Sequence, residues 1–290
     1  MSDNLVLVTG ATGKQGGATA RQLLAAGWRV RALVRDADNP AAARLAAAGA
    51  QLAVGDLTDP DSLHRAAAGA YGVFSVQPAA TEPRHDPLEV RMGRTVADAA
   101  VAAGVEHFVY ASVGGADRNT GIEHWETKWQ VEQHIRRLPL PYTILRPVMF
   151  MENHASRGPF GVFGENALIR MITPTDTVQV IAVDDIGAFA ALAFTRPDEY
   201  RGIELEIAGD EVTGAQLAAG IEAAIGRPVD TTPLPLPGPA RAGDTGSFGG
   251  WQADIPALRR RHPGLMTFDT WLDRTGAELF VRAASAHRGA

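Results

Sequence analysis

The sequence contains no cysteine. Disulfide bonds, thiolate nucleophiles and cysteine-ligated metal sites are therefore excluded. It also has no apolar run near the ~20 residues that cross a membrane, and no block of basic residues that would suit a nucleic acid or an anionic membrane surface. With a formal net charge of -6, the chain is expected to bind neither nucleic acid nor membranes.

What the sequence does contain is enough apolar material for a full core. Hydrophobic residues make up 46% of its 290 residues, an ordinary share for a globular protein. That length suits one large α/β domain with elaborations, or one large and one small lobe. A strand-like run begins at Leu5, which leaves no room for a signal peptide. We therefore expect a soluble, cytoplasmic protein.

The stretch LVLVTGATGKQGG, at residues 5–17, carries the strongest functional signal. An apolar strand runs into a turn with three glycines, and a helical pattern follows. Gly10 allows the chain to turn sharply off the strand, Gly13 allows backbone N–H groups to approach a pyrophosphate, and Gly16 allows the helix to pack closely on the sheet. The N-terminus of that helix would face the phosphates with its partial positive charge. The stretch therefore predicts a dinucleotide-binding site.

Apolar runs alternate with helical patterns along the first half of the chain. Such alternation predicts βαβ units and a parallel sheet that is covered by helices on both faces. Residues 1–147 are therefore expected to form a Rossmann-type, doubly wound dinucleotide-binding domain with six strands. The expected strands are 5–8, 28–34, 51–54, 72–76, 107–111 and 142–145, and the expected helices are 15–26, 39–48, 59–68, 88–103 and 120–137, the last with a capping box at Thr120–Glu123.

The pattern loosens after residue 147, and residues 148–290 are expected to form a smaller C-terminal α/β lobe. This lobe would be interleaved with the core and would cover the carboxyl ends of the strands, where ligands bind in open α/β sheets. Residues 231–239 are proline-rich and expected to be extended, and residues 240–250 are glycine-rich and expected to be mobile. The expected strands of the lobe are 178–183 and 203–207, and its expected helices are 185–194, 213–225, 251–261 and 267–284.

Two cations favour NADP(H) as the cofactor. Arg35 stands at the end of the second strand, where NAD-binding domains usually have an acidic residue. A guanidinium there can pair with a 2′-phosphate, and Lys14 in the glycine turn adds a second positive charge within reach. Asp36 could accept from a ribose hydroxyl, so use of NAD(H) stays open. In the alternative interpretation, Arg35 and Lys14 are solvated surface charges.

The ends of the third and fourth strands carry further candidate contacts to the cofactor. Asp56 and Leu57 follow the third strand, and a carboxylate there could accept from the exocyclic amine of adenine. Asp56 could instead cap the helix that begins near Asp59. Gln77 follows the fourth strand and is expected to lie beside the ribose on the nicotinamide side.

Four segments together resemble the NmrA-like branch of the atypical short-chain dehydrogenase/reductases. They are GATGKQGG at 10–17, VRALVR at 30–35, GDLTD at 55–59 and ILRPVMFMENH at 144–154, and the resemblance extends from residue 5 to about 225. It implies a Rossmann core that binds NADP(H), with a C-terminal lobe over the nicotinamide. For single residues it implies Gly10, Thr12, Gly13, Gln15 and Gly16 around the pyrophosphate, Arg35 at the 2′-phosphate, Pro147 near the nicotinamide and Phe150 in the pocket.

The resemblance also identifies candidates for catalysis. Ordinary short-chain dehydrogenases use a serine and a Tyr-x-x-x-Lys pair. Here Ser112 follows the fifth strand, and His124 and Lys128 stand in the places of the tyrosine and the lysine, on one face of a helix. His124 would donate or relay a proton, and Lys128 would bind ribose hydroxyls. Alternatively, His124 is a surface or packing residue and Ser112 only shapes the turn.

These observations predict an NADPH-dependent oxidoreductase of a small carbonyl, quinone or enone. The substrate would contact Met149, Phe150 and side chains within 160–171. No metal is expected, because the histidine in Glu152-Asn-His154 has no second histidine at ligand spacing. A non-catalytic NADP(H) redox sensor that regulates a protein partner is the alternative, and an epimerase or bond-cleaving relative is a third. Homodimer formation stays open.

Overall fold

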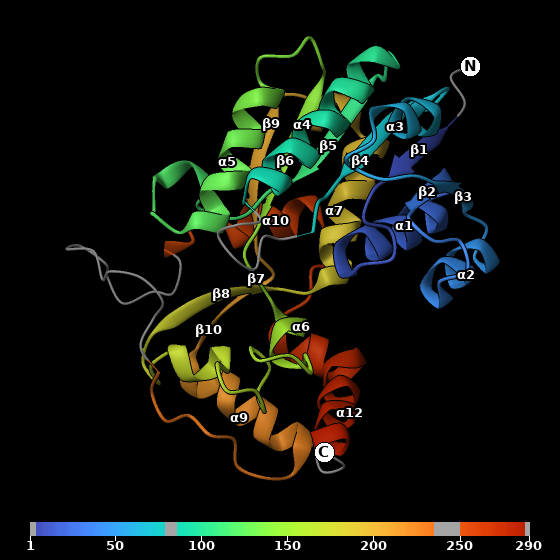
Figure 1. Ribbon diagram of the computed structural model, residues 1–290. Coiled ribbons are helices and arrows are strands. Elements are labelled where there is room, and N and C mark those ends of the chain that lie inside the picture. The colour runs from blue at the N-terminus through green and yellow to red at the C-terminus, as the bar shows by residue number, and fades with distance from the viewer. Residues whose placement is uncertain (1–3, 79–85, 235–249, 288–290) are drawn as a thin grey trace. The chain divides into compact units, whose positions relative to one another are not determined.

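The computed structural model describes residues 4–78, 86–234 and 250–287 (Figure 1). The chain divides into two compact units. The first consists of Met1–Arg146 and Ile186–Leu205, and the second of Pro147–Asp185 and Glu206–Ala290. Each unit is described by itself below.

The first unit is built on a seven-stranded sheet with the strand order β3-β2-β1-β4-β5-β6-β9. The pairs formed among β1 to β6 are all parallel. The strand order reverses between β1 and β4, and this point in a doubly wound sheet is where ligands bind. The strands are β1 (Leu5–Val8), β2 (Arg29–Val34), β3 (Gln51–Val54), β4 (Gly72–Ser75), β5 (His107–Ala111), β6 (Tyr142–Pro147) and β9 (Ile203–Ile207).

The expected fold class is confirmed, but the expected number of strands in this sheet is wrong. Residues 203–207 do form a strand, and this strand is β9, the seventh member of the main sheet. The chain returns to the main sheet through α7 (Val183–Thr195), which packs on α1 (Lys14–Ala25). A Cβ added to Gly187 would lie 2.6 Å from the backbone carbon of Ala18. The local sequence pattern predicts that residues 203–207 form a strand, but it does not show which strand they pair with.

Helices cover both faces of this sheet. One core cluster joins residues of the strands to three helices, through Leu63 of α3, Val96 of α4 and Val131 of α5. Helices α1 and α7 pack against each other outside this cluster. The helices expected at 39–48 and 59–68 are confirmed, and they begin where the Asn39 and Asp59 side chains accept from the N–H groups of the residues two positions on. The remaining helical elements are α2 (Pro40–Ala47), α3 (Pro60–Ala67), α4 (Asp86–Ala102), η2 (Ala116–Arg118), α5 (Glu123–Ile135) and α8 (Pro197–Tyr200).

The expected capping box at the start of the fifth helix is wrong. Helix α5 begins at Glu123 with Ile122 as its N-cap, and no side chain caps it. The Thr120 hydroxyl instead accepts from the Ile122 N–H at 3.3 Å, and the Glu126 carboxylate accepts from the Gly121 N–H at 3.2 Å. These bonds form a turn before the helix. Thr120 has the spacing of a capping residue, but it lies two positions before the actual N-cap.

The second unit contains a three-stranded sheet in which β10 pairs antiparallel with β8 and β7 pairs parallel with β8. The helix expected at 213–225 is confirmed as α9, with Thr213 in a capping box. The helix expected at 251–261 starts only at Ile255, where Asp254 caps it. The elements are β7 (Met149–Phe150), α6 (Met151–His154), η3 (Leu168–Met171), β8 (Thr177–Ile181), β10 (Asp210–Thr213), α9 (Gly214–Ile225), α10 (Ile255–Arg261), α11 (Phe268–Trp271), the π-turn η5 (Leu272–Gly276) and α12 (Ala277–His287).

Two expectations fall on residues that are partly or wholly outside the described ranges. Residues 231–234 have no regular secondary structure, and the rest of the proline-rich stretch lies outside, as does the glycine-rich stretch up to residue 249. Within the described ranges, no helix is both long and apolar enough to cross a bilayer. The same residues hold no cluster of three or more histidines and acids that would ligate a metal ion.

Candidate functional site

The glycine turn at the end of β1 has the geometry that its sequence predicts. Gly10 has a φ of +57°, and a Cβ there would lie 2.7 Å from a Val76 side-chain carbon. A Cβ on Gly16 would lie 2.3 Å from the Gly10 carbonyl oxygen. Both positions therefore require glycine, one for the turn and one for the close approach of α1 to it.

The turn is fixed to the neighbouring strand at the point where the strand order reverses. The Thr9 hydroxyl donates to the Val76 carbonyl at 2.9 Å and accepts from the Val76 N–H at 2.9 Å. Gln77 follows directly and is buried, and its amide nitrogen donates to Ser75 Oγ at 2.8 Å. The Gly turn and Gln77 therefore lie side by side at the carboxyl ends of β1 and β4.

This corner of the unit has unfilled hydrogen-bonding capacity. The side-chain oxygens of Gln15 and Gln77 are buried without a hydrogen-bond partner among the described residues. Helix α1 has Gly13 as its N-cap, with no capping side chain and no acidic residue in its first turn. An uncapped helix N-terminus attracts phosphate, and buried acceptors need donors such as ribose hydroxyls or a carboxamide. The residues present therefore fit a dinucleotide.

Arg35 and Asp56 lie at the same edge of the sheet, after β2 and β3. Asp56 Oδ1 accepts from both the Thr58 hydroxyl, at 2.6 Å, and the Thr58 N–H, at 2.7 Å. These bonds lower the pKa of Asp56, and the positive charges of Arg35 and Arg91 lower it further. Asp56 thus shapes its own turn, while Asp59 caps α3. Leu57 is half-buried, and Arg35, Thr12 and Lys14 are exposed.

The three predicted catalytic side chains have different surroundings. His124 is exposed in the first turn of α5, with its ring centroid 6.2 Å from that of Trp125. The Lys128 ammonium is buried and bonds the Glu89 carboxylate at 2.6 Å. The Ser112 hydroxyl is buried and donates to Glu132 Oε1 at 2.5 Å. Catalytic roles for these three residues stay predictions.

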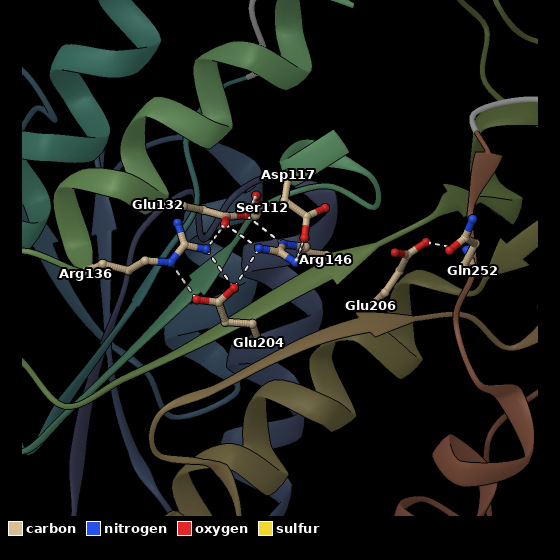
Figure 2. Close-up of polar contacts among 8 residues, drawn as sticks. All are labelled: Ser112, Asp117, Glu132, Arg136, Arg146, Glu204, Glu206 and Gln252. Carbon is tan, nitrogen blue, oxygen red and sulfur yellow. Dashed lines mark hydrogen bonds and ion pairs between the residues drawn. The ribbon is translucent and has the colours of Figure 1, made fainter. Parts of the chain in front are cut away.

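Glu132 lies at the centre of a buried charge network that was not predicted (Figure 2). Arg146, near the end of β6, bonds both Glu132 oxygens and also reaches Asp117, at 2.7 Å, and Glu204, at 2.8 Å. Arg136, one turn after Glu132, bonds Glu132 and Glu204. Burial by itself would lower the pKa of Arg146, but its bonds to Glu132 and the surrounding negative charges hold the pKa above its ordinary value.

A signal for this network is present in the sequence. Lys128, Glu132 and Arg136 recur at every fourth position of one helix, so they share a face and point the same way. Three charged residues of alternating sign on one face of a helix and its C-cap imply charged partners on the neighbouring elements. The partners come from α4, β6 and β9, which local spacing does not reveal.

Pro147, Met149 and Phe150, the residues predicted near the nicotinamide ring and the substrate, lie in the second unit. Pro147 and Met149 are buried, and Phe150 is half-buried in β7. The Glu152 carboxylate of the FMEN segment accepts from the Val183 N–H at 3.1 Å and from the Trp271 indole N–H at 3.0 Å. The segment therefore contacts Val183, the first residue of α7, and Trp271 of α11, both within this unit, and its substrate contacts stay predictions.

The sheet and the glycine turn define a Rossmann-type protein. The chain belongs to the NmrA-like family, whose profile matches residues 2–238. It is 32% identical to an NAD(P)H azoreductase of Xenophilus azovorans over 78% of this chain and 75% of that protein. It is also 32% identical to the (4-alkanoyl-5-oxo-2,5-dihydrofuran-3-yl)methyl phosphate reductase of Streptomyces griseus, again over 78% and 75%.

Solved structures agree on the fold. NmrA, a negative transcriptional regulator in complex with NADP, superposes with a TM-score of 0.75 at 19% identity, covering 99% of this chain and 98% of that one. The triphenylmethane reductase of a Citrobacter species, complexed with NADP(H), has a TM-score of 0.65 at 24% identity and 79% coverage of both chains. At these identities the two likenesses concern the fold alone.

Proposed function

We propose that this protein is an NADPH-dependent oxidoreductase that reduces a small carbonyl, quinone or enone. The observation that carries the proposal is the corner between β1 and β4. There an uncapped helix N-terminus and a glycine turn occur with two buried amide oxygens, Gln15 Oε1 and Gln77 Oε1, that have no hydrogen-bond partner among the described residues. The similarity to an NAD(P)H azoreductase and to a second reductase supports the same assignment.

Each part of the cofactor has a residue suited to it. The first-turn N–H groups of α1 would bind the pyrophosphate, and Arg35 would pair with the 2′-phosphate. The free oxygen of Asp56 would accept from the adenine amine, and Gln77 and Lys128 would bind the ribose on the nicotinamide side. When bound, NADPH supplies the hydride.

His124 is our candidate donor for the proton that the reduction needs. His124 lies on the solvent side of α5, so it exchanges protons with water and can pass one on through a water molecule. Ser112 already donates its hydroxyl proton to Glu132, so we assign it a positioning role in the turn after β5.

A redox sensor is the second candidate. NmrA, which shares the fold, is a transcriptional regulator, and this chain has no tyrosine in the place where short-chain dehydrogenases carry one. A sensor needs unequal affinities for the oxidised and reduced cofactor. Equal binding of NADP⁺ and NADPH would remove this candidate.

Titration with NADPH and NADH, followed by nicotinamide absorbance with a panel of quinones, enones and azo dyes, tests the proposal. Preferential NADPH binding with substrate-dependent oxidation is the expected result. Tight binding without oxidation of any panel compound would favour the sensor. Binding of neither cofactor would overturn both functions.

A further inference from the structure

We infer that Glu89, on α4, is a positioning residue that holds the Lys128 ammonium in place for the ribose on the nicotinamide side of the cofactor. This inference rests on the proposed function, because it assigns a task to Lys128 within that cofactor site. Glu89 lies 39 positions before Lys128 in the chain.

The Glu89 carboxylate is held on both oxygens. Oε1 accepts from Lys128 Nζ at 2.6 Å, and Oε2 accepts from the Thr127 hydroxyl at 2.8 Å. The Glu89 side chain is 1% exposed and that of Lys128 is 9% exposed. A carboxylate buried to this degree needs a cation and hydrogen bonds to stay charged, and these two neighbours on α5 supply them.

Close packing of the two helices places the pair. A Cβ added to Gly93, one turn after Glu89, would lie 2.7 Å from the Val131 side chain, which is three positions after Lys128. The absence of a side chain at Gly93 therefore allows α4 to approach α5. Because the helices are this close, the Glu89 and Lys128 side chains bond directly, without water between them.

The pair lies near the carboxyl edge of the sheet. Helix α5 connects β5 to the parallel strand β6, so its N-terminal half is at this edge. Glu132 bonds Ser112, which directly follows β5. Lys128 is one helical turn, or ~5.4 Å, nearer to the helix N-terminus than Glu132. This position is outside the carboxyl ends of the strands, where ligands bind in such folds.

Lys128 keeps donors for a ligand. An ammonium has three N–H donors, and Glu89 is the only hydrogen-bond partner of Lys128 Nζ among the described residues. Buried donors are normally satisfied, so the two that remain suit ribose hydroxyls. Glu89 keeps the ammonium charged and limits where it points, while Lys128 makes the contact.

Calorimetric titration of the full chain with NADPH and with 2′,5′-ADP tests the inference. The second ligand is the adenosine half of the cofactor and lacks the nicotinamide ribose. Glu89→Gln and Lys128→Met should each weaken NADPH about 10-fold or more, and each should leave the affinity for 2′,5′-ADP within about twofold. If Glu89 acts through Lys128, the double variant should bind NADPH no more weakly than Lys128→Met.

Asp98→Asn is the matched control. Asp98 on α4 pairs with His134 on α5 at 2.7 Å, but its side chain is 56% exposed. It should leave both affinities unchanged. If Glu89→Gln does not fold, Thr127→Val releases one carboxylate oxygen and should weaken NADPH alone.

Three outcomes separate the possibilities. A purely structural ion pair would make Glu89→Gln less stable without changing the NADPH affinity, and this result would overturn the inference. Equal weakening of NADPH and 2′,5′-ADP would overturn it too. Failure of the unaltered protein to bind either ligand would overturn the proposed function itself.

Discussion

The Arg146 guanidinium and the Glu132 carboxylate form a two-pronged ion pair, with Nε–Oε1 at 3.0 Å and Nη2–Oε2 at 2.7 Å. The Glu132 side chain is fully buried and that of Arg146 is 8% exposed. The pair joins α5 to β6, and through Ser112 it also joins the end of β5. It therefore fixes the helix that carries His124 and Lys128 against the carboxyl edge of the sheet.

Arg146→Met should destabilise the protein by about 3 kcal/mol, because a buried carboxylate loses its main cation. Arg136 and Ser112 still contact Glu132, so the loss should not exceed the usual range for a broken buried pair. Urea unfolding followed by circular dichroism measures it. Arg282→Gln is the control, since that exposed residue pairs with Glu278 on the surface of α12. Equal stability of the two variants would show that the network adds nothing.

Gly16→Ala should abolish cofactor binding. Its Cβ would overlap the Gly10 carbonyl oxygen, so the turn and the first turn of α1 would have to separate and the N–H groups would no longer converge. Titration with NADPH measures the effect. Gly158→Ala is the matched control, because the nearest atom to a Cβ there is 4.0 Å away. A Gly16→Ala variant that binds NADPH normally would place the phosphate site elsewhere.

Arg35→Ala should erase the preference for NADPH over NADH. A charge-assisted bond to a 2′-phosphate contributes roughly 1.5–3 kcal/mol, so the NADPH affinity should fall about 10–100-fold while that for NADH stays nearly constant. Asp36 cannot replace this contact, because its negative carboxylate would repel a phosphate; its Oδ1 accepts from the Asp38 N–H in the adjoining turn. Arg44→Ala, an exposed cation on α2, should change neither affinity. An unchanged affinity ratio in Arg35→Ala would contradict the assignment.

The sequence predicts the parts of this site that depend on neighbouring residues and misses those that depend on distant ones. The turn at Gly10 and the caps at Asn39 and Asp59 follow from local backbone chemistry, and all were predictable. The charge network needs partners from separate helices and strands, such as Arg146 and Glu204, which are 58 positions apart. For the same reason β9 could be located in the sequence but not assigned to its sheet.

Stability should fall as the pH drops from about 6.5 to 4, and His107 supplies part of this loss. Burial lowers its pKa to about 4, and the charge of Arg201 contributes. The Thr143 hydroxyl donates to the Tyr200 carbonyl at 2.6 Å, so it accepts from His107 Nε2 at 2.8 Å. The imidazole is therefore neutral, with Nδ1 bare and without a partner among the described residues.

The sign of the pH effect follows from these pKa values. Between pH 4 and 6.5, His107 is protonated in the unfolded chain and neutral in the folded chain. The free energy of unfolding therefore decreases as the pH falls. The loss from this residue is on the order of 3 kcal/mol. His154 in the second unit, whose pKa burial also lowers to about 4, adds a loss of the same sign.

Urea unfolding at intervals between pH 4 and 7 measures the slope. His107→Gln can still donate to Thr143 but does not titrate, so its stability should fall less steeply over this range, although its stability at pH 7 will be lower. His64→Gln, exposed on α3, should keep the steep profile. If His107→Gln lost stability between pH 6.5 and 4 as steeply as the unaltered protein, the loss would have to come from other groups. His107 would then bind a proton at the same pH in the folded chain as in the unfolded chain. That proton would sit on Nδ1, which has no acceptor among the described residues.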